Sequence, residues 1–216
     1  MKHFIGRVLL LAAAVIAASC VAEQIDREES GLVEKTYTVV MEPGTRAILG
    51  DDLYPSWEKG ETVSVYDPVA HVSRNFSVTS VSGAKAEIKG AISVGNFPFS
   101  AVYPSSAVGK WNSISDCTLN IPVQQNIPEG RNVDPSVLVS QAYSDNTSSA
   151  IVFRNSVSLL KFKPGHESVE EISFVLHQEE SSTEYVVKPA SAFDTDVWYY
   201  MAVAPGEYGS GGTVKS

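Results

Sequence analysis

The stretch ETVSVYD, from Glu61 to Asp67, alternates between polar and apolar side chains. Val63 and Val65 fall on one face of an extended chain, whereas Thr62, Ser64 and Tyr66 fall on the other. Because the side chains of a strand point alternately to its two faces, this pattern predicts a strand with one buried and one solvent-facing side.

Similar β-branched and aromatic runs recur around this stretch, and turn-forming residues separate them at intervals of about 8 to 15 residues. RNFSVTSV and KAEIKG predict a hairpin that turns at Ser82 and Gly83, and the almost wholly apolar FPFSAVYP predicts a central strand. Further strand signals are KTYTVVM, CTLNIP, VLVSQAYS, AIVFRN, SVSLLKFKP, EISFVLH, EYVVKP and WYYMAVAPG. No window has a helical period, apart from one helical turn near Asp134 to Val137.

Roughly a dozen short strands with short connections predict an all-β fold in which neighbouring strands pair antiparallel. The natural packing is an antiparallel β-sandwich with Greek-key, transthyretin- or immunoglobulin-like topology. We expect this domain to span residues 35–216, with Trp57 and Trp198 in its core. The closing TVKS resembles the start of another strand, so we expect a sheet that lacks its final strand, or a truncated domain, with an open edge near Ser216.

The N-terminus has the features of a secretory signal peptide. Lys2 and Arg7 precede an apolar run that ends in small residues before Cys20. The run, Val8 to Ser19, is about a dozen residues, whereas a membrane-spanning helix needs about 20. We therefore expect residues 1–19 to be a signal peptide.

The sequence AASC, ending at Cys20, resembles the lipobox of bacterial lipoproteins, although Ala17 stands where leucine is usual. The resemblance implies lipid attachment at Cys20; the alternative is a free thiol after ordinary cleavage. Two or three acyl chains on one residue give stable anchoring. Residues 20–34 are polar and acidic, and we expect them to be a flexible tether.

Charge limits the partners of the chain. Removal of Lys2 and Arg7 lowers the basic residues from 16 to 14 against 25 acidic ones, so the net charge falls from −9 to −11. An acidic protein repels phosphate backbones, which argues against nucleic-acid binding and against peripheral docking on anionic lipid. We expect contact with the membrane through the lipid anchor only.

No catalytic or metal-binding set converges in the sequence. SWEK and SDN match fragments of a serine acyl-enzyme motif, but Pro55 and Gly60 leave no room for the required helix. His71, His166 and His177 lack the spacing of zinc ligands. We therefore expect a protein that is not an enzyme and that uses no metal or cofactor.

Six motifs in order resemble the N-terminal domain of fimbrillin-like lipoproteins of gut and oral anaerobes. They are GTRAILGDD, YPSWEKGETVSVYD, FSAVYPSS, IPVQQNIPEGRNVDPSVLVSQAYS, IVFRNSVSLLKF and WYYMAVAPGEYGSG, and they cover about Thr36 to Gly212. Glu61 departs from the family pattern, in which aspartate is usual at that position.

The resemblance implies a subunit of a fimbria (pilus) or an adhesin, anchored in the outer membrane at the cell surface. It implies assembly with other fimbrial subunits, or binding to host or bacterial surface ligands, by β-strand addition. Proteolytic trimming at Arg46 or Arg27 would be part of such assembly; the alternative for both is an ordinary surface arginine.

A second hypothesis is a surface glycan-binding lipoprotein that captures polysaccharide. Exposed aromatic side chains would then form the sugar platform, with Trp111 as the candidate contact. A flat row of exposed aromatic rings would favour this hypothesis, and burial of Trp57, Trp111 and Trp198 would count against it.

Overall fold

A computed structural model describes residues 31–42, 57–166, 168–178 and 181–204, together with the backbone of 212–215. The chain divides into two compact units, Met1–Ser30 and Gly31–Ser216, and the description below concerns the second. Apart from two short 3-10 turns, the regular structure of the described residues consists of strands. The predicted all-β class is therefore confirmed.

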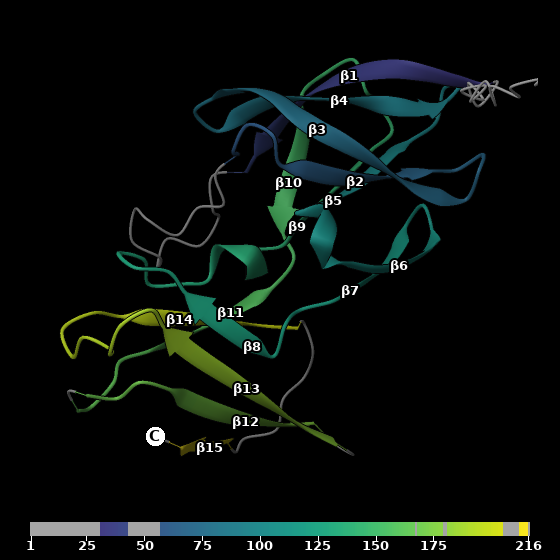
Figure 1. Ribbon diagram of the computed structural model, residues 1–216. Coiled ribbons are helices and arrows are strands. Elements are labelled where there is room, and N and C mark those ends of the chain that lie inside the picture. The colour runs from purple at the N-terminus through teal and green to yellow at the C-terminus, as the bar shows by residue number, and fades with distance from the viewer. Residues whose placement is uncertain (1–30, 43–56, 167, 179–180, 205–211, 216) are drawn as a thin grey trace, which may run out of the picture. The chain divides into compact units, whose positions relative to one another are not determined.

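Seven strands form a closed barrel (Figure 1). They are β1 (Leu32–Met41), β2 (Thr62–Asp67), β3 (Val72–Ser82), β4 (Lys85–Ser93), β5 (Phe99–Tyr103), β9 (Ser140–Ser144) and β10 (Ile151–Asn155). Their order around the barrel is β1-β10-β9-β5-β2-β3-β4. The first strand begins at Leu32, three residues before the predicted start of the domain, and the expected hairpin is β3 and β4.

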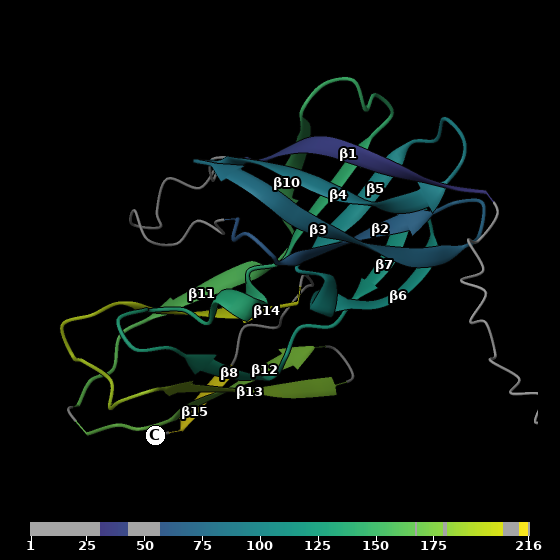
Figure 2. The same ribbon diagram turned by 45° about the horizontal axis from the view of Figure 1, so that its top comes forward.

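The barrel interior is filled by alternate side chains of its strands. β1, β3 and β4, which lie side by side in Figures 1 and 2, send Val39, Phe76 and Ile88 into one cluster with no exposed surface. A Cβ at Gly90 would come within 2.7 Å of the Phe76 ring, so glycine is needed where β4 passes that ring. Replacing Phe76 by alanine would cost about 3–5 kcal/mol of folding free energy.

The central strands are more buried than their alternation predicts. All five residues of β5 are buried, as expected of a central strand, but Ser64 and Tyr66 of β2 are buried as well. The reason is a hairpin of β6 (Val108–Ser113) and β7 (Asp116–Leu119) that packs against the outer face of the barrel. Trp111 Nε1 donates to Ser64 Oγ at 3.0 Å, so the predicted solvent-facing side of β2 is covered.

The remaining strands form two further sheets. A ribbon pairs β11 (Ser158–Phe162) with β14 (Tyr199–Val203), and a four-stranded sheet has the order β15-β12-β13-β8. Its strands are β8 (Gln124–Ile127), β12 (Ile172–Gln178), β13 (Ser181–Pro189) and β15 (Gly212–Lys215). The 3-10 turns are η1 (Ser105–Ala107) and η2 (Pro135–Val137), and the second coincides with the predicted helical turn.

Two pairings differ from the expected antiparallel neighbours. β1 pairs with β10, and β13 with β8, in parallel. Parallel strands need a long crossover, and each of these pairs joins strands that are far apart in the sequence. The short connections between consecutive strands therefore gave no indication of these two parallel pairings.

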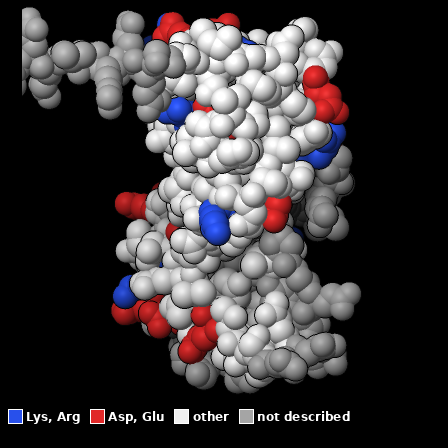
Figure 3. All heavy atoms as spheres, turned by 90° about the vertical axis from the view of Figure 1, so that its right-hand side faces the viewer, with Lys and Arg blue, Asp and Glu red and all other residues white. Residues whose placement is uncertain are grey.

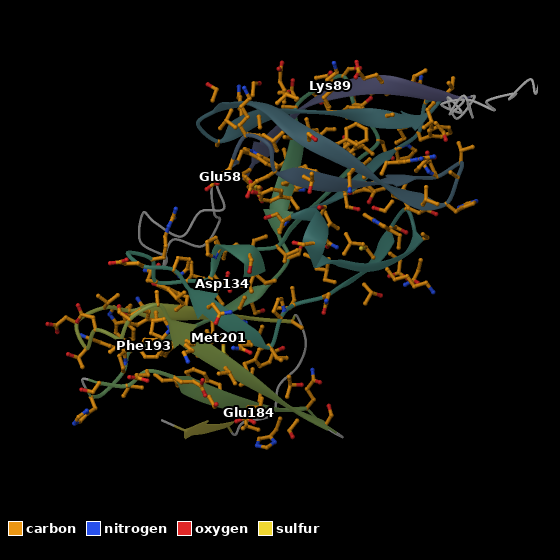
Figure 4. The ribbon with its side chains drawn as sticks, in the orientation of Figure 1. Glu58, Lys89, Asp134, Glu184, Phe193 and Met201 are labelled. Atoms are coloured by element: carbon orange, nitrogen blue, oxygen red, sulfur yellow. The ribbon has the colours of Figure 1, made fainter. Side chains whose placement is uncertain are left out.

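Every residue of β14 is buried because hydrophobic clusters lie on both faces of the ribbon. Tyr200 and Ala202 belong to one cluster, together with the outward-facing Val102 of the barrel. Met201 belongs to another, together with Phe193 and residues of β12 and β13 (Figure 4). The ribbon is therefore a central layer, which explains why its sequence has no alternation.

Candidate functional site

Sheet edges are the candidate interaction sites, because an unpaired strand presents free N–H and C=O groups to another chain. The inner edge of β14 is closed by a side chain. Gln125 has no exposed surface, and its amide nitrogen donates to Ala202 O while its Oε1 accepts the Ala202 N–H at 2.9 Å. The Gln125 amide thus takes the place of a neighbouring strand.

Two further contacts close edges in the same region. Tyr200 N–H of β14 donates to Asn132 O at 2.9 Å. Asp134, labelled in Figure 4, accepts the Asn126 N–H of β8 at 2.8 Å and also caps η2 through Ser136 N. These contacts block strand pairing at β14 and at part of β8.

The outer edge of β11 has no such closure. In an antiparallel pair of strands, two residues that face each other either both direct their N–H and C=O groups toward the partner strand or both direct them away from it. Ala202 and Tyr200 direct theirs away from β11, toward Gln125 and Asn132, so their partners Leu159 and Lys161 direct theirs away from β14. In the described part of the chain, no backbone hydrogen bond reaches Leu159 or Lys161 on that side. We call the backbone groups of these two residues the β11 edge.

The side chains along β11 are also incompletely covered. Leu159 packs against the cluster of Tyr200, while Leu160 and Phe162 pack against that of Met201, and all three are only partly buried. On β14 the facing residues are fully buried. A strand added at the β11 edge would therefore bury apolar surface as well as pair the backbone.

The exposed tryptophan of this region lies beside β11. Trp198 is 48% exposed, and Lys161 Nζ lies 4.6 Å from the centre of its ring. A cation–π contact of this kind is worth about 0.5–1 kcal/mol at an exposed site. The prediction that Trp198 belongs to the core is wrong, because Trp198 directly precedes the buried strand and its side chain lies outside both clusters.

A second edge strand among the described residues is β15. Its backbone pairs antiparallel with β12 from Ser173↔Lys215 to Leu176↔Gly212, and β15 is the outermost strand of its sheet. The strand predicted at TVKS corresponds to β15, whereas the expectation of a sheet that lacks its final strand stays a prediction.

A hollow of about 290 Å³ lies between the β6–β7 hairpin and the barrel strands β5, β9 and β10. Trp111 forms one side of it and is partly buried. Its ring centre lies 5.4 Å from that of Tyr66, and its Nε1 is used by Ser64. Trp111 therefore holds the hairpin on the barrel, while part of its ring faces the hollow.

The other predicted site residues divide into two groups. Cys20, Arg27 and Arg46 lie outside the described residues, as do the RAILG stretch and most of the acidic tether. Trp57 is 3% exposed and belongs to the barrel core, as predicted. The three tryptophans thus form neither a common exposed row nor a buried set.

Several titratable groups in the described part of the chain have raised pKa values. Burial and the Asp116 carboxylate raise the pKa of Cys117 to about 11, so this thiol is protonated near neutral pH. Burial and the hydrogen bond to Glu61 raise the pKa of Tyr103. Across the described residues no three His, Cys, Asp or Glu side chains gather to bind a metal ion.

On the face seen in Figure 3, acidic side chains occur in small groups and basic ones are scattered, with no broad basic patch among the described residues drawn there. Neither 3-10 turn approaches the length and apolarity that a membrane-spanning helix requires. Comparison with protein-family models, with curated protein sequences and with solved structures finds no match.

Proposed function

We propose that this chain is a lipid-anchored cell-surface subunit of a fimbria or adhesin, without enzymatic activity, which assembles or binds by β-strand addition. The observation that carries the proposal is the β11 edge. Leu159 and Lys161 offer two N–H and two C=O groups to a partner, while side chains close the neighbouring edges. Strand addition uses such an edge for affinity and partly filled side-chain positions for specificity.

Contrast between edges supports the proposal. Proteins protect exposed edges because an open edge invites association. Here Gln125 and Asp134 are buried polar residues that pair with backbone at β14 and β8. β11 has no equivalent among the described residues, and its apolar side chains stay partly exposed. An edge left open beside closed ones fits a binding function.

The Greek-key sandwich also remains a proposal. The barrel divides into the layers β10-β9-β5 and β2-β3-β4-β1 if the β2–β5 and β1–β10 pairings are taken as seams. These seams have two paired positions between β2 and β5 and three between β1 and β10, against nine between β1 and β4. The pairing of β9 with β10, which lies within a layer, also has two positions, fewer than the β1–β10 seam.

Lys161→Pro tests strand addition. Proline removes the outward N–H of Lys161 and leaves the pairing of β11 with β14 in place, since proline is tolerated on the open side of an edge strand. Lys161→Ala is the matched control, because it removes the same side chain and its contact with Trp198 but keeps the N–H. We expect Lys161→Pro to lose assembly on cells, measured by cross-linking and sedimentation, and Lys161→Ala to keep it. Equal assembly of the two variants would refute the proposed site.

Anchoring is tested separately at Cys20. Under the proposal, the Cys20→Ala form incorporates no labelled palmitate and leaves the membrane fraction, whereas the Cys117→Ala form behaves as the unmodified chain. Retention of Cys20→Ala in the outer membrane would refute lipid anchoring. Trimming at Arg46 or Arg27 is checked by mass spectrometry of the mature N-terminus.

Glycan capture is the second candidate function. The observation that favours it is the hollow beside Trp111, which also has Tyr143 on its lining. Tyr143 is 52% exposed, so an aromatic ring is available to a ligand there. Saturation-transfer NMR with a panel of neutral and acidic oligosaccharides tests this function, and the absence of any transfer would argue against it.

A further inference from the structure

The hollow between the β6–β7 hairpin and the barrel is built from fixed side chains. Tyr143 Oη donates to Asp145 Oδ1 at 3.0 Å, and Trp111 Nε1 donates to Ser64 Oγ at 3.0 Å. Each bond holds the orientation of an aromatic ring that lines the hollow. A ligand therefore meets two oriented aromatic rings, which lowers the entropy lost on binding.

The hollow contains hydrogen-bond donors that the contacts among the described residues leave free. Ser156 Oγ donates to Gln141 Oε1 at 3.1 Å, which leaves the Gln141 NH2 group without a partner among the described residues. Arg154 Nε lies 3.2 Å from Glu42 Oε2, so the two terminal nitrogens of that guanidinium are not used by this ion pair. An arginine has five N–H donors, and most of those on Arg154 remain for a ligand.

Among the described residues, Arg154 is also the single charged one that lines the hollow. In the described part of the chain, no Asp or Glu carboxylate belongs to the lining, although the chain as a whole has a net charge of −9. Arginine binds carboxylates through two parallel N–H···O bonds, a geometry that lysine cannot supply. Glu42 pairs with Arg154 from outside the lining, so the terminal donors that Arg154 keeps free, rather than a net positive charge, favour an anionic ligand over a neutral one.

From this arrangement we infer that the hollow binds an acidic sugar, a pyranose ring that bears a carboxylate. The apolar face of the ring packs on Tyr143 and Trp111, and the carboxylate meets the Arg154 guanidinium and the Gln141 amide. The volume of about 290 Å³ is at the lower end for ligand sites, which fits one or two sugar rings. This inference rests on the glycan-binding candidate and is independent of strand addition at β11.

NMR titration of the folded chain with glucuronate, glucose and acetate tests the inference. The Trp111 indole N–H and the Gln141 side-chain amide report binding in the hollow itself. We expect glucuronate to bind at least about tenfold more tightly than either glucose or acetate. We expect Arg154→Gln to abolish that preference and Tyr143→Ala to weaken glucuronate binding. Arg131→Gln, at an exposed arginine outside the hollow, is the control and should change neither.

Each contrary result has a distinct meaning. Equal binding of glucuronate and glucose would overturn the acidic-sugar inference and leave the glycan-binding candidate standing. Glucuronate binding that survives Arg154→Gln would also overturn it. The absence of binding by any of the three compounds would overturn both. None of these outcomes bears on assembly at the β11 edge, which the Lys161 variants measure.

Discussion

Asp67→Asn should destabilise the barrel, and the size of the effect should depend on pH. The Asp67 side chain has no exposed surface and lies at the turn between β2 and β3. One carboxylate oxygen accepts Val69 N–H at 3.1 Å and Ala70 N–H at 3.2 Å. The other accepts Arg74 Nε at 3.2 Å, Ser93 N–H at 3.1 Å and Ser93 Oγ at 2.8 Å. Every neighbour is a donor, so an amide NH2 on either side would face donors.

The magnitude follows from the pKa of this carboxyl. Burial alone would raise the pKa of Asp67, but the hydrogen bonds from Ser93, Ala70 and Val69 outweigh it and lower the pKa from 3.8 to about 2. A shift of that size corresponds to about 2 kcal/mol of stability above the unfolded-state pKa. Water near the partly exposed Arg74 screens the charge, so we expect about 1 to 2 kcal/mol. Because the folded-state pKa is lowered, this stability is lost as the pH falls from about 4 to about 2.

Urea unfolding at several pH values measures the effect. Near neutral pH, Asp67→Asn should cost about 2–4 kcal/mol, because donors lose their ionised acceptor. The gap between the two proteins should narrow by about 1 to 2 kcal/mol toward pH ~2, where the native carboxyl becomes protonated. Asp196→Asn is the matched control, since the Asp196 side chain is 96% exposed. A gap that stays constant with pH would refute the role assigned to the charge.

Three further substitutions or measurements test other parts of the account. Gln125→Leu should cost about 2–4 kcal/mol in urea unfolding, because the Ala202 N–H and C=O lose their buried partner; a loss below about 0.5 kcal/mol would show that β14 needs no closure. Ser140→Ala should be neutral or stabilising in thermal melts, because the buried Ser140 Oγ has no hydrogen-bond partner among the described residues. A loss above about 1 kcal/mol would contradict this. Cys117 should react slowly with iodoacetamide in the folded chain until the pH approaches about 11, since burial and Asp116 raise its pKa. Equal reaction rates of the folded and the unfolded chain near pH ~8 would contradict this expectation.

Much of the barrel could be predicted from local pattern. The hairpin at Ser82 and Gly83 and the almost wholly apolar strand 99–103 both carry signals within a few residues. The burial of the outer face of β2 could not be predicted. It depends on a hairpin more than forty residues away, whose Trp111 donates a hydrogen bond to Ser64. Ser64 and Tyr66 read as solvent-facing because their own neighbours give no sign of that contact.

The interaction surfaces were harder to predict than the strands. Trp198 and Tyr200 stand in one aromatic run, yet Trp198 is 48% exposed and Tyr200 is 3% exposed, a difference set by the two clusters on either side of the ribbon. Gln125 has the local sequence of a surface residue. A buried glutamine that pairs with the backbone of another strand can be recognised only once β8 and β14 are placed together.

Amide hydrogen exchange at Leu159 and Lys161 tests the central claim most directly, when the isolated subunit is compared with assemblies taken from the cell surface. The account predicts fast exchange of both amides in the isolated chain and strong protection in the assembly. The Ala202 amide, which bonds to Gln125, should be protected in both states. Equal exchange of Leu159 and Lys161 in the two states would show that the β11 edge receives no strand.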